Sequence, residues 1–192
     1  PENTETFNQF SSIYITSLRQ LERSDVMATF RNIQEFEKII FEDLSFNNVV
    51  TNRALEPFYF DDPWSKHLRG KTVLIVHGFV SSIKCQLRRS QNLFSNPNTL
   101  PPFKAKFVQM PQALGGNTPH DSYMETLSVV KKEIDAVGLF DIAIVAAGAY
   151  AMPLVVHCKV KHHAAAIAVG GGSQLLFGLR GKRWDTHELS KL

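Results

Sequence analysis

Cysteine is scarce in this chain of 192 residues, and its two cysteines are not arranged for metal binding or redox chemistry. Cys85 and Cys158 form no CxxC pair, and each lies among apolar residues of a predicted helix. This spacing excludes a zinc finger and a disulfide scaffold. Buried free thiols are typical of a reducing compartment, so we expect a cytoplasmic protein.

Charge of one sign and long apolar runs are also lacking. The net charge is only +3, which is too small to indicate a nucleic-acid partner. No stretch reaches the roughly 18 apolar residues that a membrane span requires, so we expect no span. The chain is 44% hydrophobic and 20% charged, and these values are typical of a globular domain.

Strand and helix patterns alternate after Pro63. The run from Thr72 to Val76 is apolar and β-branched throughout, as in strands that are covered on both faces. Such alternation predicts a Rossmann-like α/β fold, with a mainly parallel sheet and helices on both faces. Strands are predicted at 72–76, 104–109, 141–146 and 164–169, and helices at 81–94, 122–137, 149–160 and 173–179.

The first 62 residues show a different pattern. Apolar residues at three- and four-residue steps predict an amphipathic helix at 4–22. A strand is predicted at 25–30, a helix at 32–40 and a second strand at Val49 and Val50. We therefore divide the chain into a helical N-terminal part, residues 1–62, that packs on a Rossmann-like ligand-binding core, residues 63–192.

Three of the predicted strands end in turns that contain glycine and lead into a helix, at 77–79, 147–149 and 170–172. The carboxyl ends of parallel strands share one edge, and open α/β sheets bind their ligands there. Glycine lets a ligand approach the backbone, and the first amides of a helix attract phosphate. The pattern therefore predicts a site for a phosphate-bearing ligand. Ordinary tight turns are the alternative interpretation.

Side chains beside the first turn supply further candidate contacts. The hydroxyls of Ser81 and Ser82 and the ammonium of Lys84 suit phosphate oxygens, although a helix cap and a surface lysine are equally ordinary roles. His77 ends a buried strand, where a histidine is either a hydrogen-bonded core residue or a functional one. Gly78 would allow the ligand to approach the backbone.

The segment that follows the third turn combines aromatic, small and basic residues. Aromatic rings can stack on a base or a sugar, and basic side chains can neutralise a diphosphate. The alternative is a C-terminal cap in which Trp184 fills a groove. The candidate ligand contacts in this segment are Gly170, Gly171, Gly172, Ser173, Gln174, Phe177, Lys182, Arg183 and Trp184.

Two other chemistries are disfavoured by the residues present. The strand and His-Gly turn at 72–79 are similar to those of α/β-hydrolases, but the turn at 147–150 offers Ala149 or Tyr150 where a nucleophile would stand. A catalytic triad is therefore excluded. His157, His162 and His163 lie close in sequence, but no carboxylate lies near them along the chain, so we expect no metal there.

Three segments carry a resemblance to known proteins: RALEPFYFDDPWSKHLRGKTVLIVHGFVSSIKCQ, DIAIVAAGAYAMPLVVHCK and AAAIAVGGGSQLLFGLRGKRW. They resemble a family of uncharacterised polysaccharide-biosynthesis proteins, which is itself similar to the GT-D type of glycosyltransferase. The resemblance implies transfer of a sugar from a nucleotide-sugar donor to a glycan acceptor, with Mn²⁺ or Mg²⁺ accompanying the donor. Gly148 and Tyr150 match the family's Gly-Ala-Tyr turn.

One departure from the GT-D pattern concerns the acidic metal-binding motif, which is not found here. We expect the chain either to be a fragment or to have lost that motif. Asp61 and Asp62 are candidate substitutes for it, although an acidic pair before a Pro-Trp turn more commonly caps a helix. Together with His77 they are the candidate catalytic residues. A non-catalytic nucleotide- or sugar-binding module and a structural interaction domain stay open as alternative functions.

Overall fold

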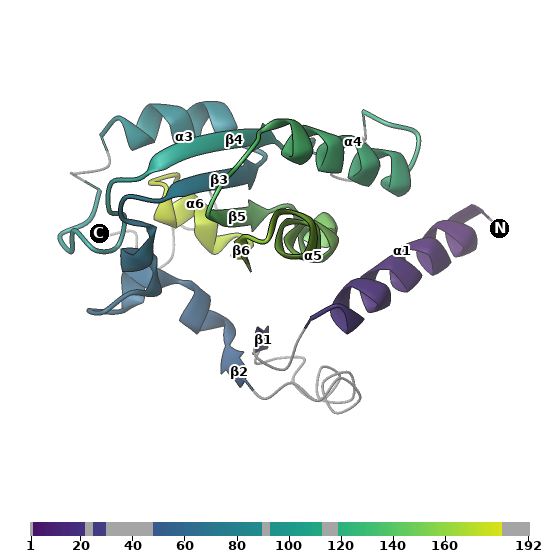
Figure 1. Cartoon of the computed structure of the whole chain (residues 1–192), viewed down its shortest axis with the longest axis horizontal. Coiled ribbons are helices and arrows are strands. Elements are labelled where there is room, and N and C mark those ends of the chain that lie inside the picture. The colour runs from purple at the N-terminus through teal and green to yellow at the C-terminus, as the bar shows by residue number, and fades with distance from the viewer. Residues whose placement is uncertain (1, 22–24, 30–47, 90–92, 113–118, 182–192) are drawn as a thin grey trace.

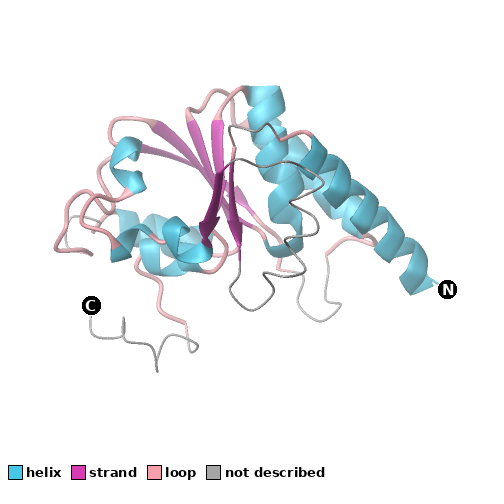
Figure 2. Cartoon of the chain, turned by 90° about the horizontal axis from the view of Figure 1, so that it is seen from below, coloured by secondary structure: helices cyan, strands magenta, loops and turns pink. Residues whose placement is uncertain are grey.

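A four-stranded parallel sheet forms the centre of the computed structural model, which describes residues 2–21, 25–29, 48–89, 93–112 and 119–181 (Figure 1). The strands are β3 (Thr72–His77), β4 (Lys104–Gln109), β5 (Ile142–Ala146) and β6 (Ala165–Ala168), in the order β4-β3-β5-β6. They alternate with α3 (Val80–Leu87), α4 (Tyr123–Ala136), α5 (Ala151–His162) and α6 (Gly172–Leu176). Figure 2 shows helices on both sides of the sheet, so the predicted Rossmann-like α/β fold is confirmed.

The central position of β3 explains its uninterrupted apolar sequence. Val73 to His77 are all buried, because β3 pairs with β4 on one side and β5 on the other. The strand β4 is an edge strand, and its side chains from Lys104 to Phe107 are exposed or half-buried. Lysine on an edge strand discourages pairing with a further strand.

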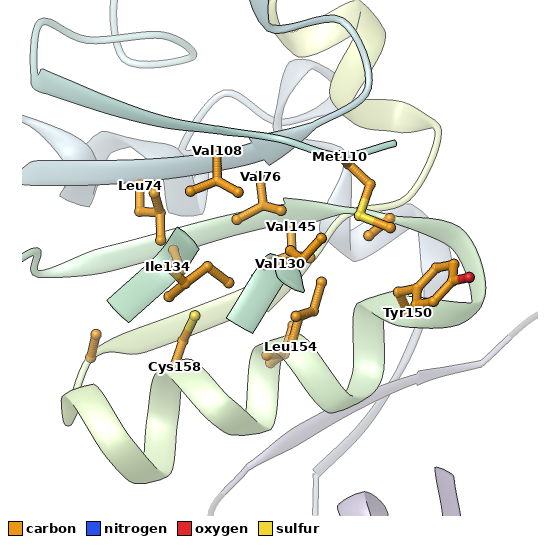
Figure 3. Close-up of a cluster of buried hydrophobic side chains, with 14 of the residues drawn as sticks. Leu74, Val76, Val108, Met110, Val130, Ile134, Val145, Tyr150, Leu154 and Cys158 are labelled. Carbon is orange, nitrogen blue, oxygen red and sulfur yellow. The ribbon is translucent and has the colours of Figure 1, made fainter. Parts of the chain in front are cut away.

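The two faces of the sheet are packed separately. On one face, strand residues such as Leu74, Val76 and Val145 pack against α4 and α5, with Ile134 and Leu154 among the fully buried partners (Figure 3). On the other face, Val73, Ile75 and Ile144 pack with residues of α3 and of the α6 region. Each buried aliphatic side chain contributes about 1.5–3 kcal/mol to stability.

The N-terminal part comprises a helix and a small second sheet. The helix α1 (Glu2–Arg19) packs on α4 and α5, where the rings of Phe10 and Tyr123 meet edge to face at 5.4 Å. The strands β1 (Val26–Thr29) and β2 (Asn48–Thr51) occur where the sequence predicts strands, and the structure pairs them in parallel. The predicted helix at 32–40 lies outside the described residues. Lys159 ties this part to α5 through a 2.5 Å ion pair with Asp25.

Short helical turns connect the small sheet to β3. They are η1 (Asn52–Leu55), η2 (Pro57–Tyr59) and η3 (Trp64–Leu68), and a fourth, η5 (Gly148–Tyr150), leads into α5. The helices predicted at 81–94 and 173–179 end earlier, at Leu87 and Leu176. The second of these ends because Gly178 takes a left-handed conformation (φ 69°). No described helix is both long enough and apolar enough to cross a membrane.

Candidate functional site

The strand order places a topological switch point between β3 and β5. The chain leaves β3 for β4 on one side and then crosses to β5 on the other, and His77 and Ala146 form the last aligned pair of β3 and β5. Ligands of open α/β sheets bind outside the carboxyl ends of the strands at such a point. We call the turns 77–79 and 147–149 together the switch-point edge. The turn 170–172 follows β6 on the same edge, so the structure brings the three predicted turns to one edge.

The switch-point edge presents mainly backbone and one exposed ring. Gly148 is exposed with φ 53°, and a Cβ built on it meets nothing within 4 Å. Ala149 is exposed as well. The ring of Phe79 is 42% exposed and lies 5.5 Å from the ring of His77. The sequence interpretation did not select Phe79, although an aromatic residue directly after a His-Gly turn was a usable indication.

His77 is a buried, neutral connector between two of the turns. The Phe79 N–H donates to Nδ1 of His77 at 2.9 Å, so the ring hydrogen lies on Nε2, which is 3.1 Å from Oγ of Ser173. Ser173 in turn donates to the carbonyl oxygen of Gly170 at 2.6 Å. Burial lowers the pKa of His77 to about 4. With both ring nitrogens engaged, the residue holds the turns together.

The turn at 170–172 already has a carboxylate beside it. A Cβ built on Gly172 would lie 2.9 Å from Oε1 of Glu56, which follows η1. The helix α6 that begins here is only five residues long. A negative side chain therefore lies where the sequence predicts a phosphate, and Glu56 is a residue that sequence reasoning missed. No local pattern identifies it, because the contact joins distant segments.

Four of the predicted ligand contacts are buried in the structure: Gly172 and the side chains of Tyr150, Ser173 and Phe177. Ser173 and Phe177 are fully buried, and Phe177 belongs to the core between the sheet and α3. Tyr150 stacks on Tyr123 with ring centroids 4.3 Å apart, and the Tyr123 hydroxyl donates to the carbonyl oxygen of Ala149. These side chains shape the edge from beneath. Gly171 and Gln174 are half-buried, and Gly170 is exposed.

The polar residues of α3 lie in two places, some beside the switch-point edge and one beside the edge strand β4. Ser81 and Ser82 are exposed in the first turn of the helix, next to the switch-point edge. The ammonium of Lys84 instead lies 4.9 Å from the ring centroid of Phe107. It lines an open hollow of about 310 Å³ beside the edge strand β4, together with Leu87, Arg88, Ala105 and Phe107. Lys84 is therefore turned away from the predicted phosphate.

Asp61 and Asp62 lie toward the opposite edge of the sheet. Both carboxylate oxygens of Asp62 accept from Nζ of Lys66, at 2.5 and 2.6 Å. The carbonyl oxygen of Asp61 accepts from Asn96, and both lie in segments that lead into the amino ends of β3 and β4. The structure does not bring these carboxylates together with His77. They do not fit a Mn²⁺ or Mg²⁺ ion that accompanies a donor diphosphate at the switch-point edge.

The remaining predicted contacts, Lys182, Arg183 and Trp184, lie outside the described residues. Arg180 precedes them and is exposed. A hydrolase function is disfavoured further, because Gly148 is the positive-φ residue of the turn after β5 and has no side chain to act as nucleophile. No protein-family model, curated protein or solved structure matches this chain.

Proposed function

We propose that this chain binds a nucleotide-sugar at the switch-point edge, as the donor-binding domain of a GT-D-like glycosyltransferase that acts on a glycan acceptor. The observation that carries the proposal is the pairing of two glycine turns at the switch point, with the exposed ring of Phe79 beside them. The resemblance of three segments to polysaccharide-biosynthesis proteins supports this class of ligand. Cys158 is a buried free thiol as expected, whereas Cys85 is free but exposed, which corrects the expectation that both are buried. Free thiols favour the cytoplasm as its location.

Backbone amides would make the principal contacts with the diphosphate. The first amides of α3, and those of η5 leading into α5, lack partners within their own helices. They lie at the positive ends of the helix dipoles. The hydroxyls of Ser81 and Ser82 add donors, and the Phe79 ring offers a stacking surface for a base or a sugar.

Glycosyl transfer also requires a base for the acceptor hydroxyl and positive charge for the leaving diphosphate. The contacts of His77 and Asp62 favour a second candidate function, a nucleotide-sugar-binding module without catalysis. His77 is buried with both ring nitrogens engaged, and Asp62 is paired with Lys66. In the catalytic version, Lys182 and Arg183 supply the positive charge.

Calorimetric titration with UDP-, GDP- and dTDP-sugars, each with and without Mn²⁺, tests the proposal. Saturable binding of one nucleotide-sugar supports it, and absence of binding to all of them contradicts it. Release of free nucleotide diphosphate in the presence of a glycan acceptor would distinguish the enzyme from the binding module. Binding without turnover favours the module.

Two matched pairs of variants test the position of the site. Ala149→Glu adds a negative charge beside the expected diphosphate, whereas Ala149→Gln adds a side chain of similar size without charge. We expect only the glutamate to weaken binding strongly. Phe79→Ala should weaken binding about tenfold through loss of stacking, while Phe60→Ala, at a ring that is 43% exposed, should leave it unchanged. Equal effects within either pair would place the ligand elsewhere.

A further inference from the structure

A cluster of two histidines and one aspartate joins α4 to α5. Nε2 of His157 and Nε2 of His162 each lie 2.8 Å from Oδ1 of Asp135. The three potential ligand atoms all lie within 4.8 Å of one another, and the three residues are half-buried. The sequence interpretation expected no metal at these histidines, because no carboxylate lies near them along the chain. The structure overturns that reason, since α4 supplies Asp135.

The cluster is separate from the switch-point edge. Asp135 stands near the end of α4, just before β5, and His162 is the last residue of α5, just before β6. Both helix ends therefore lie at the amino edge of the sheet. In Figure 3, Ile134 and Cys158, the sequence neighbours of Asp135 and His157, lie at the end of the core away from Tyr150. Metal binding here would be independent of the nucleotide-sugar.

The backbone around the cluster is held in place by the core. Ile134 and Cys158 are fully buried, so they fix the positions of the adjacent ligand residues. The ring of His162 lies 5.0 Å from that of Phe140 and 5.6 Å from that of His157, which restricts its rotation. A set of ligands that is already assembled loses little conformational entropy when it binds an ion.

We propose that Asp135, His157 and His162 form a three-ligand site for Zn²⁺ or a similar borderline divalent ion. Two imidazole nitrogens and one carboxylate oxygen are a common zinc ligand set, with bonds of about 2.0–2.2 Å and a fourth position for water. The ion takes the place of the hydrogens between the Nε2 atoms and Oδ1. Each imidazole then carries its hydrogen on Nδ1.

The neighbouring lysines determine how strongly the site binds. Nζ of Lys161 lies 2.7 Å from Oδ2 of Asp135, so it leaves Oδ1 available and orients the carboxylate. Its positive charge also opposes a divalent cation, as does that of Lys131, which interacts with Asp135 electrostatically. Imidazole favours zinc over magnesium, which prefers oxygen ligands. We therefore expect a zinc site that does not respond to Mg²⁺.

Titration of Zn²⁺ and of Co²⁺ into the full chain tests the site, in a Cys85→Ser background because that thiol is exposed. We expect one ion per chain, a rise in melting temperature with Zn²⁺ but not with Mg²⁺, and a visible Co²⁺ absorption band. Asp135→Asn, His157→Gln and His162→Gln should each weaken Zn²⁺ binding at least tenfold. His67→Gln and His163→Asn serve as controls, and the asparagine tolerates the left-handed backbone at 163 (φ 52°).

Lys161→Gln provides a test in the opposite direction. Glutamine can still donate to Oδ2 of Asp135, but the opposing charge is gone, so Zn²⁺ should bind several-fold more tightly. The Lys161 side chain is 58% exposed, so we expect the substitution to leave the fold intact, and the melting temperature without metal checks this. Zinc binding that is unsaturable, or that is unaffected by the three ligand substitutions and by Lys161→Gln, would overturn the proposal and leave the cluster as an ion-pair clamp.

Discussion

The two edges of the sheet differ in the chemical groups that they present. At the carboxyl edge, the turns 77–79 and 147–149 expose glycine and alanine backbone and the ring of Phe79, with the uncharged hydroxyls of Ser81 and Ser82 beside them. At the amino edge, charged side chains satisfy one another and the strand ends, as when Asp141 accepts from the Thr72 amide at 2.7 Å. The comparison shows why the two edges suit different ligands. Backbone amides without helical partners suit an anion, whereas clustered imidazole and carboxylate groups suit a metal cation.

The histidines at the two edges also differ in the charge of their partners. Burial alone lowers the pKa of His77 to about 4, since its partners are uncharged groups. Burial also lowers the pKa of His157, but the hydrogen bond and charge of Asp135 oppose it. Desolvation raises the pKa of Asp135, yet the hydrogen bonds from Lys161, His162 and His157 hold it well below its ordinary value. His77 is thus a neutral connector, and the amino-edge histidines face a carboxylate.

The largest expected effect is a loss of stability, and it tests whether Phe177 belongs to the core rather than to the ligand site. Phe177→Ala should lower the free energy of unfolding by about 3–5 kcal/mol, because the ring is fully buried and its removal leaves a cavity. Urea denaturation measures the change. Phe60→Ala is the control, since that ring is 43% exposed and its loss should cost about 0.5 kcal/mol or less. If Phe177→Ala were as stable as the original chain but no longer bound nucleotide, Phe177 would contact the ligand, as the sequence predicts.

The stability of the chain should depend on pH in the acid range, because His77 at the carboxyl edge is neutral when folded. The pKa of His77 is about 4 in the folded chain, whereas an unburied histidine has an ordinary pKa of 6.5. The unfolded chain therefore binds more protons between these values. The free energy of unfolding should therefore fall as the pH falls through this window, by up to about 3 kcal/mol from this residue. Urea denaturation across the window measures it. His77→Gln should show a correspondingly shallower pH dependence, and an unchanged dependence would contradict the assignment.

A pair of glycine substitutions compares the two edges directly. Gly148 at the carboxyl edge and Gly70 at the amino edge both have positive φ, and a Cβ built on either meets nothing within 4 Å. Alanine at either position should cost about 1–2 kcal/mol of stability, through backbone strain alone. Only Gly148→Ala should also weaken nucleotide-sugar binding in calorimetry. Equal nucleotide-sugar affinity in the two variants would show that the ligand does not bind at the switch-point edge.

The smallest expected effect concerns the carboxylate beside the third turn. Glu56→Gln keeps the size and hydrogen-bonding capacity of the side chain but removes a negative charge next to Gly172. Nucleotide-sugar affinity should rise several-fold, equivalent to about 1 kcal/mol. The same titration with Glu133→Gln, an exposed residue of α4, is the control. Weaker binding by Glu56→Gln would show that the carboxylate contacts the ligand favourably.

Much of the fold could be predicted because its information is local. The strand predicted at 104–109 has the same bounds in the structure, and the strand predicted at 72–76 is one residue longer. A continuous β-branched run, or apolar residues at helical spacing, can be recognised within a single segment of sequence. The sharing of one edge by the three glycine turns followed from the parallel topology. The burial of Phe177 was missed, because the same aromatic residue is expected in a core and in a ligand site.

The amino-acid sequence by itself determined the elements of this protein and, through their alternation, the parallel sheet with its glycine turns on one edge. Only the tertiary structure decided which side chains meet. It joined His77 to Ser173, 96 residues away, and Asp135 to His162, 27 residues away, and it laid Glu56 against Gly172. Hydrophobic periodicity records which side of an element is buried. Contacts between distant segments depend on strand order and on how the helices pack, which no local pattern contains.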